Sequence, residues 1–216
     1  IGNNSKSSGT NAIALGTTSR TNRNNAIAIG NETLSEGENS ISIGNGAKSK
    51  EKDSITIGKN VIAEQSDSIA IGNNTKSSGT NAIAIGNTSK TNANNSIALG
   101  NKIEAMAANS INIGNNGYAG GESSISIGNN SKSSGTNAIA IGNTSKTNAN
   151  NAIALGNKIE AMAANSINIG NNGYAGGESS ISIGNNSKSS GTNAIALGTT
   201  SRTNRNNAIA IGNKTE

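Results

Sequence analysis

Large aliphatic residues alternate with small ones in a short pattern that returns along the whole chain. The pattern reads NAIALG at residues 11–16, NAIAIG at 25–30 and NSISIG at 39–44. A glycine closes it at every fourteenth position from Gly2 to Gly212, without insertion or deletion. Counted from the residue after this glycine, position 11 is Ile in every complete repeat, position 13 is Ile or Leu, and positions 10 and 12 are mostly Ala or Ser. Such alternation, rich in β-branched residues, predicts a short strand in every repeat.

A second strand is predicted at positions 3–6 of each repeat. Positions 3 and 5 are never charged, whereas position 4 is Lys or Arg in nine of sixteen repeats. This alternation points positions 3 and 5 inward and position 4 to solvent. The closing glycine, usually followed by Asn, predicts a tight corner with a left-handed backbone. Glycines at position 7, such as Gly9 and Gly135, mark a second corner.

Two strands and two corners in every repeat make one coil of a narrow parallel β-roll. The chain is therefore predicted to be all-β, with about fifteen coils in one domain over residues 1–216. Only 31% of the residues are apolar and the aromatic residues are two tyrosines, but stacked repeats need only a thin core shared between neighbours. Residues 73–128 and 129–184 match at 54 of 56 positions, which favours a multivalent display surface over a catalytic domain.

The first strand of each repeat carries apolar or small residues on both faces. In a two-sheet roll, such a strand needs cover from beyond its own roll, so we expect a homo-oligomer with this strand at the interface. We expect the Ile and Leu face to fill the roll and the Ala and Ser face to let subunits approach, although the pattern also allows the reverse assignment. The structural core predicted in this way includes Ile13, Leu15, Ile27, Ile29, Ile83, Ile85, Ile139, Ile141, Ile195 and Leu197.

The run Asn-Ser/Ala-Ile-Ala-Ile/Leu-Gly, followed after about two residues by Ser-Lys-Ser-x-Gly, resembles the head repeat of the trimeric autotransporter adhesins, the YadA-type head. The resemblance is clearest at residues 129–142 and covers the whole chain. It implies a left-handed parallel β-roll in a homotrimer, displayed on the outer membrane of a Gram-negative bacterium. It also implies adhesion to matrix proteins such as collagen or fibronectin, or to host-cell glycoproteins of the CEACAM type.

The sequence departs from the family pattern in two respects. Ile stands where the family often has Val, and no neck, coiled-coil stalk or membrane anchor accompanies the repeats. Since the sequence begins and ends inside a repeat, we expect it to be part of a longer protein whose anchor lies elsewhere. Trimerisation of these residues would then rest on the head repeats alone.

The chain lacks the side chains that most catalytic and metal sites use. It has no Cys or His, and Asp53 and Asp67 are its only aspartates, so we expect neither an enzyme nor a bound metal or cofactor. Calcium-binding rolls carry Asp in their turns, where this chain carries Asn. Nucleic acid is not an expected partner because aromatic platforms are missing. No apolar run approaches the length of a membrane-spanning helix, so we expect no membrane insertion by this part of the protein.

Six residues interrupt the outward polar pattern and are the candidate partner-binding residues. They are Leu34, Ile62, Tyr118 and Tyr174, which replace the position-4 cation, and Met106 and Met162 at position 6. Exposed Tyr and Met suit a protein-binding hot spot. The alternatives are that the roll bends locally and buries them, or that they are exposed without a role. The position-4 cations favour solubility and edge protection over attraction of acidic glycans or acidic proteins.

Two further features call for a choice between structures. Residues 103–108 have high helix propensity, but the glycine spacing continues through them, so we predict an ordinary coil. Asn112 and Asn168 stand at position 12 where Ala, Ser or Thr is usual, and we expect them to hold a water or an anion if that face meets a trimer axis.

The sequence thus predicts a non-enzymatic, homotrimeric adhesin head that binds proteins or glycoproteins on its outer surface. One alternative is an inert spacer that projects a separate binding domain. A second alternative is an ice-binding solenoid, which would present a flat, uncharged Thr ladder rather than Lys and Arg.

Overall fold

The computed structural model describes residues 1–216, and every regular element in it is a β-strand. The strands form about fifteen turns of a parallel β-solenoid, which confirms the predicted all-β coils. The structure contains no helix long and apolar enough to cross a membrane. The coils fall into two compact units, residues 1–109 (unit 1) and residues 110–216 (unit 2), which are described separately.

Each coil contributes one two-residue strand and one longer strand of three to five residues. The strands of unit 1 are β1 (Lys6–Ser7), β2 (Ile13–Leu15), β3 (Arg20–Thr21), β4 (Ile27–Ile29), β5 (Leu34–Ser35), β6 (Ile41–Ile43), β7 (Lys48–Ser49), β8 (Ile55–Lys59), β9 (Ile62–Ala63), β10 (Ile69–Asn73), β11 (Lys76–Ser77), β12 (Ile83–Asn87), β13 (Lys90–Thr91), β14 (Ile97–Asn101) and β15 (Glu104–Ala105). The strands of unit 2 are β16 (Ile111–Asn115), β17 (Tyr118–Ala119), β18 (Ile125–Asn129), β19 (Lys132–Ser133), β20 (Ile139–Ile141), β21 (Lys146–Thr147), β22 (Ile153–Asn157), β23 (Glu160–Ala161), β24 (Ile167–Asn171), β25 (Tyr174–Ala175), β26 (Ile181–Asn185), β27 (Lys188–Ser189), β28 (Ile195–Leu197), β29 (Arg202–Thr203) and β30 (Ile209–Ile211).

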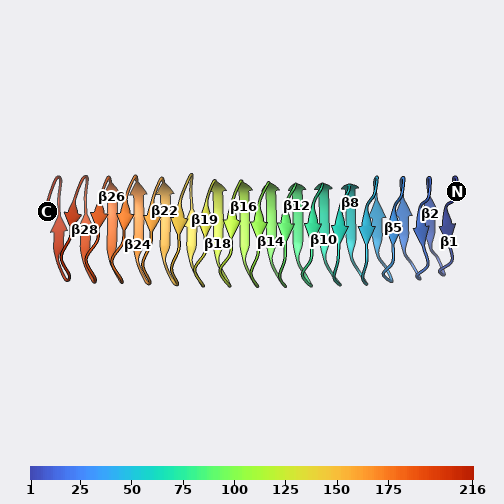
Figure 1. Cartoon of the computed structure of the whole chain (residues 1–216), viewed down its shortest axis with the longest axis horizontal. Helices are drawn as coiled ribbons and strands as arrows, with labels where there is room; N and C mark the ends of the chain where they lie inside the picture. Colours follow the sequence, from blue (N-terminus) through green and yellow to red (C-terminus); the bar gives the residue numbers. More distant parts are fainter. The chain divides into compact units, whose positions relative to one another are not determined.

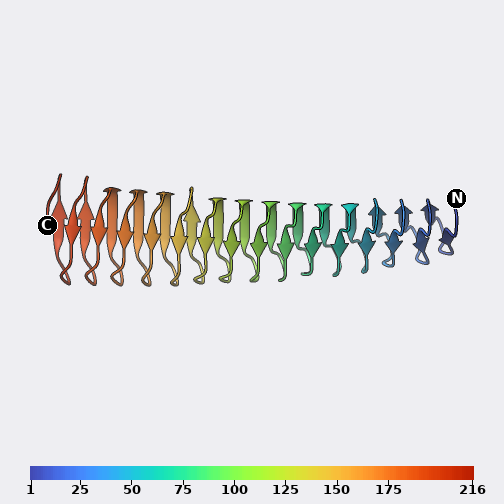
Figure 2. The same cartoon turned by 45° about the horizontal axis from the view of Figure 1, so that its top comes forward.

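Within each unit the odd-numbered strands form one parallel sheet and the even-numbered strands form the other (Figure 1). The two sheets lie against each other, as the turned view shows (Figure 2). Pairing follows the period of the repeat, so that Ile83 pairs with Ile97 and Lys132 with Lys146. Every residue is therefore stacked on its own equivalent in the next coil. The second strand is shorter than predicted, since it occupies only positions 4 and 5.

Three positions in each coil have a positive φ, and together they turn the chain. In unit 2 they are represented by Asn151 (φ 57°), Gly156 (φ 137°) and Lys158 (φ 51°). The first corner agrees with the prediction, because a Cβ at Gly156 would collide with the carbonyl oxygen of Gly170 in the next coil. The second corner differs from it, since its left-handed residue is the Asn at position 9. A position-7 glycine such as Gly135 serves only the close approach of the next coil.

The left-handed Asn residues also connect successive coils. Asn137 donates its side-chain amide to Asn151 (3.5 Å), and Asn151 donates to Asn165 (3.1 Å). Asn tolerates the left-handed conformation better than other residues with a Cβ. Its amide both donates and accepts, so Asn at position 9 of successive coils extends the ladder, which Ser123 and Ser179 interrupt in unit 2. The corner and the cross-coil bond thus depend on the same side chain.

The interior of each roll is filled by small side chains, and the expected core assignment is wrong for the single chain. Ala at position 12 is buried, whereas Ile and Leu at positions 11 and 13 point outward. Of the ten predicted core residues, Ile13, Leu15, Ile85 and Ile141 are 37–49% exposed. The other six, Ile27, Ile29, Ile83, Ile139, Ile195 and Leu197, are half-buried. The reverse assignment, which the pattern also allowed, is the one observed.

The width of the roll explains this result. Ala, Ser and Thr from the two sheets meet in the interior, and many of its hydroxyl groups are paired, as between Ser133 and Thr147 (2.9 Å). Ser133 also donates to the carbonyl of Ala138 (2.9 Å). Two rows of Ile would not fit in this space, so they face outward. Residues 103–108 form an ordinary coil as predicted, with β15 as their strand and Ile103 fully buried.

Candidate functional site

The outward Ile and Leu residues of the even-numbered strands form an apolar stripe on one face of each unit, which we call the aliphatic face. In unit 1 it runs from Ile13 to Leu99, and in unit 2 from Ile111 to Ile211. Stacking on identical neighbours leaves most of its side chains half-buried in the single chain. A contiguous apolar patch of this extent marks an interaction surface.

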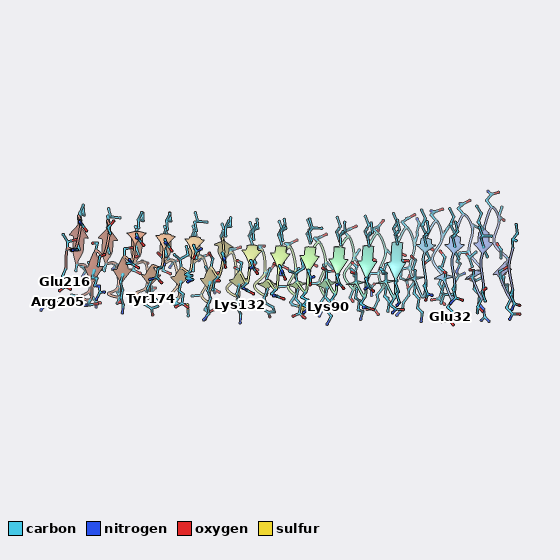
Figure 3. All side chains as sticks on the ribbon, turned by 90° about the horizontal axis from the view of Figure 1, so that it is seen from above. Glu32, Lys90, Lys132, Tyr174, Arg205 and Glu216 are labelled. Atoms are coloured by element: carbon cyan, nitrogen blue, oxygen red, sulfur yellow. The ribbon has the colours of Figure 1, made fainter.

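The opposite sheet presents the position-4 residues, which we call the outer column. In unit 2 this column reads Tyr118, Lys132, Lys146, Glu160, Tyr174, Lys188, Arg202 and Glu216. Consecutive members pair through the odd-numbered strands, for example Glu160 with Tyr174 and Tyr174 with Lys188. Figure 3 shows the labelled Lys132 and Tyr174 on the same side of unit 2. The column repeats Tyr, cation, cation and Glu over four coils.

Each tyrosine ring lies along the surface of its sheet. A Cβ at Gly176 would lie 2.6 Å from Cζ of the Tyr174 ring, so the ring covers this glycine. The ammonium of Lys188 lies 5.4 Å from the centre of the same ring, within the range of a cation–π interaction. Tyr118 has the same arrangement, with its ring over Gly120 and Lys132 at 5.3 Å. Both rings are half-buried.

A groove of about 340 Å³ lies beside Tyr174. It is lined by Asn172, Tyr174, Asn186, Ser187, Lys188, Thr200 and Arg202. The lining contains an aromatic ring, amides, hydroxyls and two cations, but no carboxylate. Met162, one of the predicted partner-binding residues, is half-buried and does not line this groove. Met106 is likewise half-buried at the end of β15.

Leu34 and Ile62 lie in different charge environments. Leu34 is half-buried and lines a groove with Lys6, Arg20 and Glu36. Ile62 stands in the outer column of unit 1 between Lys48 and Lys76. The structure therefore gives the six predicted residues separate surroundings rather than one shared pocket.

Glu64, in the same coil as Ile62, forms two salt bridges and one further hydrogen bond. Its carboxylate accepts from Lys50 (3.1 Å), Lys76 (2.9 Å) and the hydroxyl of Ser78 (2.8 Å). Burial alone would raise the pKa of Glu64, but the hydrogen bonds from Lys76, Ser78 and Lys50 outweigh it and lower the pKa to about 2. These lysines are thereby partly neutralised.

Asn168 does not face a surface where it could hold an anion. It is fully buried inside the roll, and its amide nitrogen donates to the carbonyl of Glu160 (3.0 Å). Asn112 is also fully buried. The expectation of a water or anion on an oligomer axis is therefore wrong for both residues, because position 12 points into the roll.

Sequence reasoning missed the glycines and lysines that accompany the tyrosines. Glycine occurs at position 6 only in the two coils that carry Tyr, as Gly120 and Gly176. The register between coils places Lys132 and Lys188 next to the rings. Both signals are present in the sequence once the coil is known.

The structure shows no arrangement suited to metal chemistry. No group of three or more His, Cys, Asp or Glu side chains lies close enough to hold a metal ion. The groove beside Tyr174 is lined by polar residues from three successive coils.

Comparison with known families identifies the repeat. The YadA head domain repeat (2 copies) matches residues 1–19, 7–33, 35–60, 77–102, 119–143, 133–158, 175–201 and 189–215. The matched stretches leave out residue 34 and residues 61–76, 103–118 and 159–174, which include all six predicted partner-binding residues. No match to the chain is found among curated proteins. Since the matches cover well over half of the chain, it belongs to the family of YadA head domain repeats.

Proposed function

We propose that the chain is the head of a homotrimeric autotransporter adhesin on the outer membrane of a Gram-negative bacterium. YadA-type heads are non-enzymatic adhesin domains, which supports the general function. The observation that carries the proposal is the aliphatic face, which is a long apolar stripe on an otherwise polar surface. The proposed partners are host-cell glycoproteins of the CEACAM type or matrix proteins such as collagen or fibronectin.

The aliphatic face supports an assembly in which three left-handed rolls cover it around one axis. Ile141 and Ile183 are 37% and 38% exposed in the single chain, and burial of such side chains is favourable by about 25 cal/mol per Å². The outer column would then face solvent on every subunit. Similar stacked coils would repeat the contact along each unit, so the small favourable free energies of burial in the coils would add up.

The outward surface supports binding rather than a purely mechanical role. The outer column carries Leu34, Ile62 and both tyrosines in place of a cation, and the two methionines stand at position 6 of their coils. We propose these six residues as partner-binding residues. The outer column carries Lys and Arg instead of an uncharged Thr ladder, which does not favour ice binding.

The solution mass by light scattering tests the assembly. The expected result is three times the mass of one chain, which is 21.4 kDa. A mass near that of one chain at micromolar concentration would overturn the trimer.

A binding assay tests the adhesin function separately. The chain, coupled to beads in its own assembly, is expected to bind at least one purified matrix protein or host-cell glycoprotein. No binding to any of them, together with a trimeric mass, would favour the inert spacer.

A further inference from the structure

We propose that Tyr174, Lys188 and Arg202, with the amides of Asn172 and Asn186, bind an anionic saccharide that carries a sulfate or carboxylate group. The inference rests on the proposed adhesin function and names the ligand class of one surface. It is carried by the groove beside Tyr174, where these five residues meet (Figure 3 labels Tyr174).

The tyrosine ring supplies the flat surface that a sugar ring needs. The ring of Tyr174 lies over Gly176 along the sheet instead of standing away from it. The face of an aromatic ring is negative, so it attracts the C–H groups on one face of a pyranose. A Cβ at position 6 would displace the ring from this place, so Gly176 lets the ring lie along the sheet, and the same pair occurs at Tyr118 and Gly120.

No anionic side chain pairs with the cations beside the ring, and Lys188 contacts only the ring itself, 5.4 Å from its centre. Lys188 and Arg202 form no salt bridge, and no carboxylate lines the groove. Two outer-column cations of unit 1 differ, since Lys76 is paired with Glu64 (2.9 Å) and Lys90 lies 3.8 Å from Glu104. A guanidinium and an ammonium side by side suit sulfate or carboxylate oxygens.

Amides and hydroxyls complete the lining. Asn172 donates to Asn186 (2.7 Å), which holds the two amides in one row beside the outer column. Thr200 continues this row in the next coil. Such groups donate and accept, as the hydroxyl groups of a sugar do.

Acidic residues limit the length of the site. Glu160 pairs with Tyr174 on one side, and Glu216 follows Arg202 at the next position of the outer column. The part of the outer column without carboxylates therefore spans three coils, or about 14 Å at the usual spacing of strands. This length fits a short charged segment of a glycan rather than a long continuous polyanion.

The residue types that form this site occur twice in unit 2. Tyr118, Lys132 and Lys146 repeat the arrangement four coils earlier, between Glu160 and the position of Glu104 in the sequence. In a trimer the two copies per chain would give six sites. Weak single sites would then act together on a glycan-covered surface.

A saccharide fits the surface better than an acidic peptide. A peptide could add as a strand only to a free sheet edge, but β25 is paired on both sides by β23 and β27. A peptide anchored by side chains would need an apolar pocket, and the lining offers only one ring with polar neighbours. The shallow groove with a ring and many polar groups favours a sugar.

The test is calorimetric titration of the whole chain in its own assembly. The probes are a sulfated heparin tetrasaccharide, the carboxylated 3′-sialyllactose and uncharged lactose, with an acidic peptide of equal charge. We expect one or both anionic saccharides to bind with two sites per chain, and which of them binds identifies the anion. We expect neither lactose nor the peptide to bind. Binding of the peptide alone, or equal binding of lactose, would overturn the proposal.

Substitution of the tyrosines separates the contribution of the ring to saccharide binding from that of the positive charge. Tyr118→Leu with Tyr174→Leu keeps an aliphatic residue that the outer column already accepts at Leu34, and it should weaken binding about tenfold or more. The control, Lys48→Ala in the outer column of unit 1, removes a cation away from both rings and should leave binding unchanged. Equal affinity of the double variant and the native chain, with unchanged mass and thermal midpoint, would contradict the proposed role of the rings.

A second test creates a new saccharide site instead of weakening the existing ones. Ile62→Tyr with Glu64→Gly recreates the ring, the glycine and the freed Lys76, next to the amide pair Asn60 and Asn74 (3.3 Å). The expected result is a third site per chain. A stoichiometry that stays at two in a folded trimer would contradict the proposal. If the native chain binds a deglycosylated host protein but none of the saccharides, this inference is overturned and the adhesin function still stands.

Discussion

Asn168 and Gly173 share one interior space of the roll in unit 2. A Cβ on Gly173 would lie 2.6 Å from the side-chain oxygen of Asn168, closer than side chains approach. Position 12 carries Asn only at Asn112 and Asn168, and position 3 of the following coil carries Gly only at Gly117 and Gly173. Where position 12 is Ala154, the following coil instead carries Ile159, which packs against it. Asn at position 12 is therefore accompanied by Gly at position 3 of the following coil, whereas Ile159 at position 3 is accompanied by Ala154 at position 12.

Gly173→Ala is expected to destabilise the chain, because its methyl group overfills the space beside Asn168. Overpacking of this kind costs about 1–3 kcal/mol. Asn168→Ala in the same chain should restore most of the loss, since Ala47 opposite Ser42 shows that two small residues fit. Thermal unfolding of both single variants and the double variant gives their interaction energy. Strictly additive losses would mean that the two side chains do not share the space.

Ile159→Ala tests the opposite arrangement, in which the large residue stands at position 3 and the small one, Ala154, at position 12. Ile159 is among the largest fully buried side chains, so its truncation should leave a cavity and cost about 2–5 kcal/mol. Ser131→Ala is the matched control at the same position, because it removes a hydrogen bond to Ala140 (2.8 Å) but little volume. That control should cost about 0.5–1.5 kcal/mol. Equal losses in chemical denaturation would contradict the volume argument.

The fold could largely be predicted from the sequence, and the one wrong choice has a physical reason. The spacing of the glycines fixes the coil, and the coil fixes the register, so that Ile83 stacking on Ile97 follows directly. The direction of the first strand did not follow, because alternating Ile and Ala satisfy the pattern with either face inward. Only the distance between the two sheets decides, and it leaves room for Ala84 but not for Ile83.

The surface was less predictable than the fold. The tyrosines were found because they interrupt a column of cations, but the cation–π pair of Tyr174 and Lys188 requires the register between coils. The sequence pattern does not single out Glu64 among the glutamates. Its contacts come from the coil before, through Lys50, and from the coil after, through Lys76. Contacts of this kind become visible only when the coils are stacked.

The pKa of Glu64 predicts a specific pH dependence. The pKa is lowered from 4.5 to about 2 in the folded chain, so the ionised carboxylate stabilises the fold above about pH 4.5 and this contribution is lost as the pH falls toward 2. Glu64→Gln should lower the thermal midpoint at pH 6, with an effect of about 0.2–1 kcal/mol per exposed ion pair, and the difference from the native chain should vanish near pH 2.

Glu36→Gln is the control for this measurement, because Glu36 is exposed and forms no salt bridge. Its thermal midpoint should follow that of the native chain at every pH. A difference between Glu64→Gln and the native chain that persists unchanged at pH 2 would show that the ion pairs with Lys50 and Lys76 are not its source.

The aliphatic face predicts that polar substitutions on it will separate the subunits without unfolding a roll. Ile141 and Ile183 point away from the interior and are 37% and 38% exposed in the single chain, so Ser at both positions removes apolar surface that only another subunit can cover. We expect Ile141→Ser with Ile183→Ser to lower the light-scattering mass toward the 21.4 kDa of one chain, while circular dichroism keeps its β signal. Lys146→Ser, on the outer column of the same unit, removes a side chain of similar length from the opposite sheet and should leave the mass unchanged. If the Ile variant keeps the mass of the native assembly, the subunits must meet through another surface, and the outer column with its two tyrosines becomes the next surface to test.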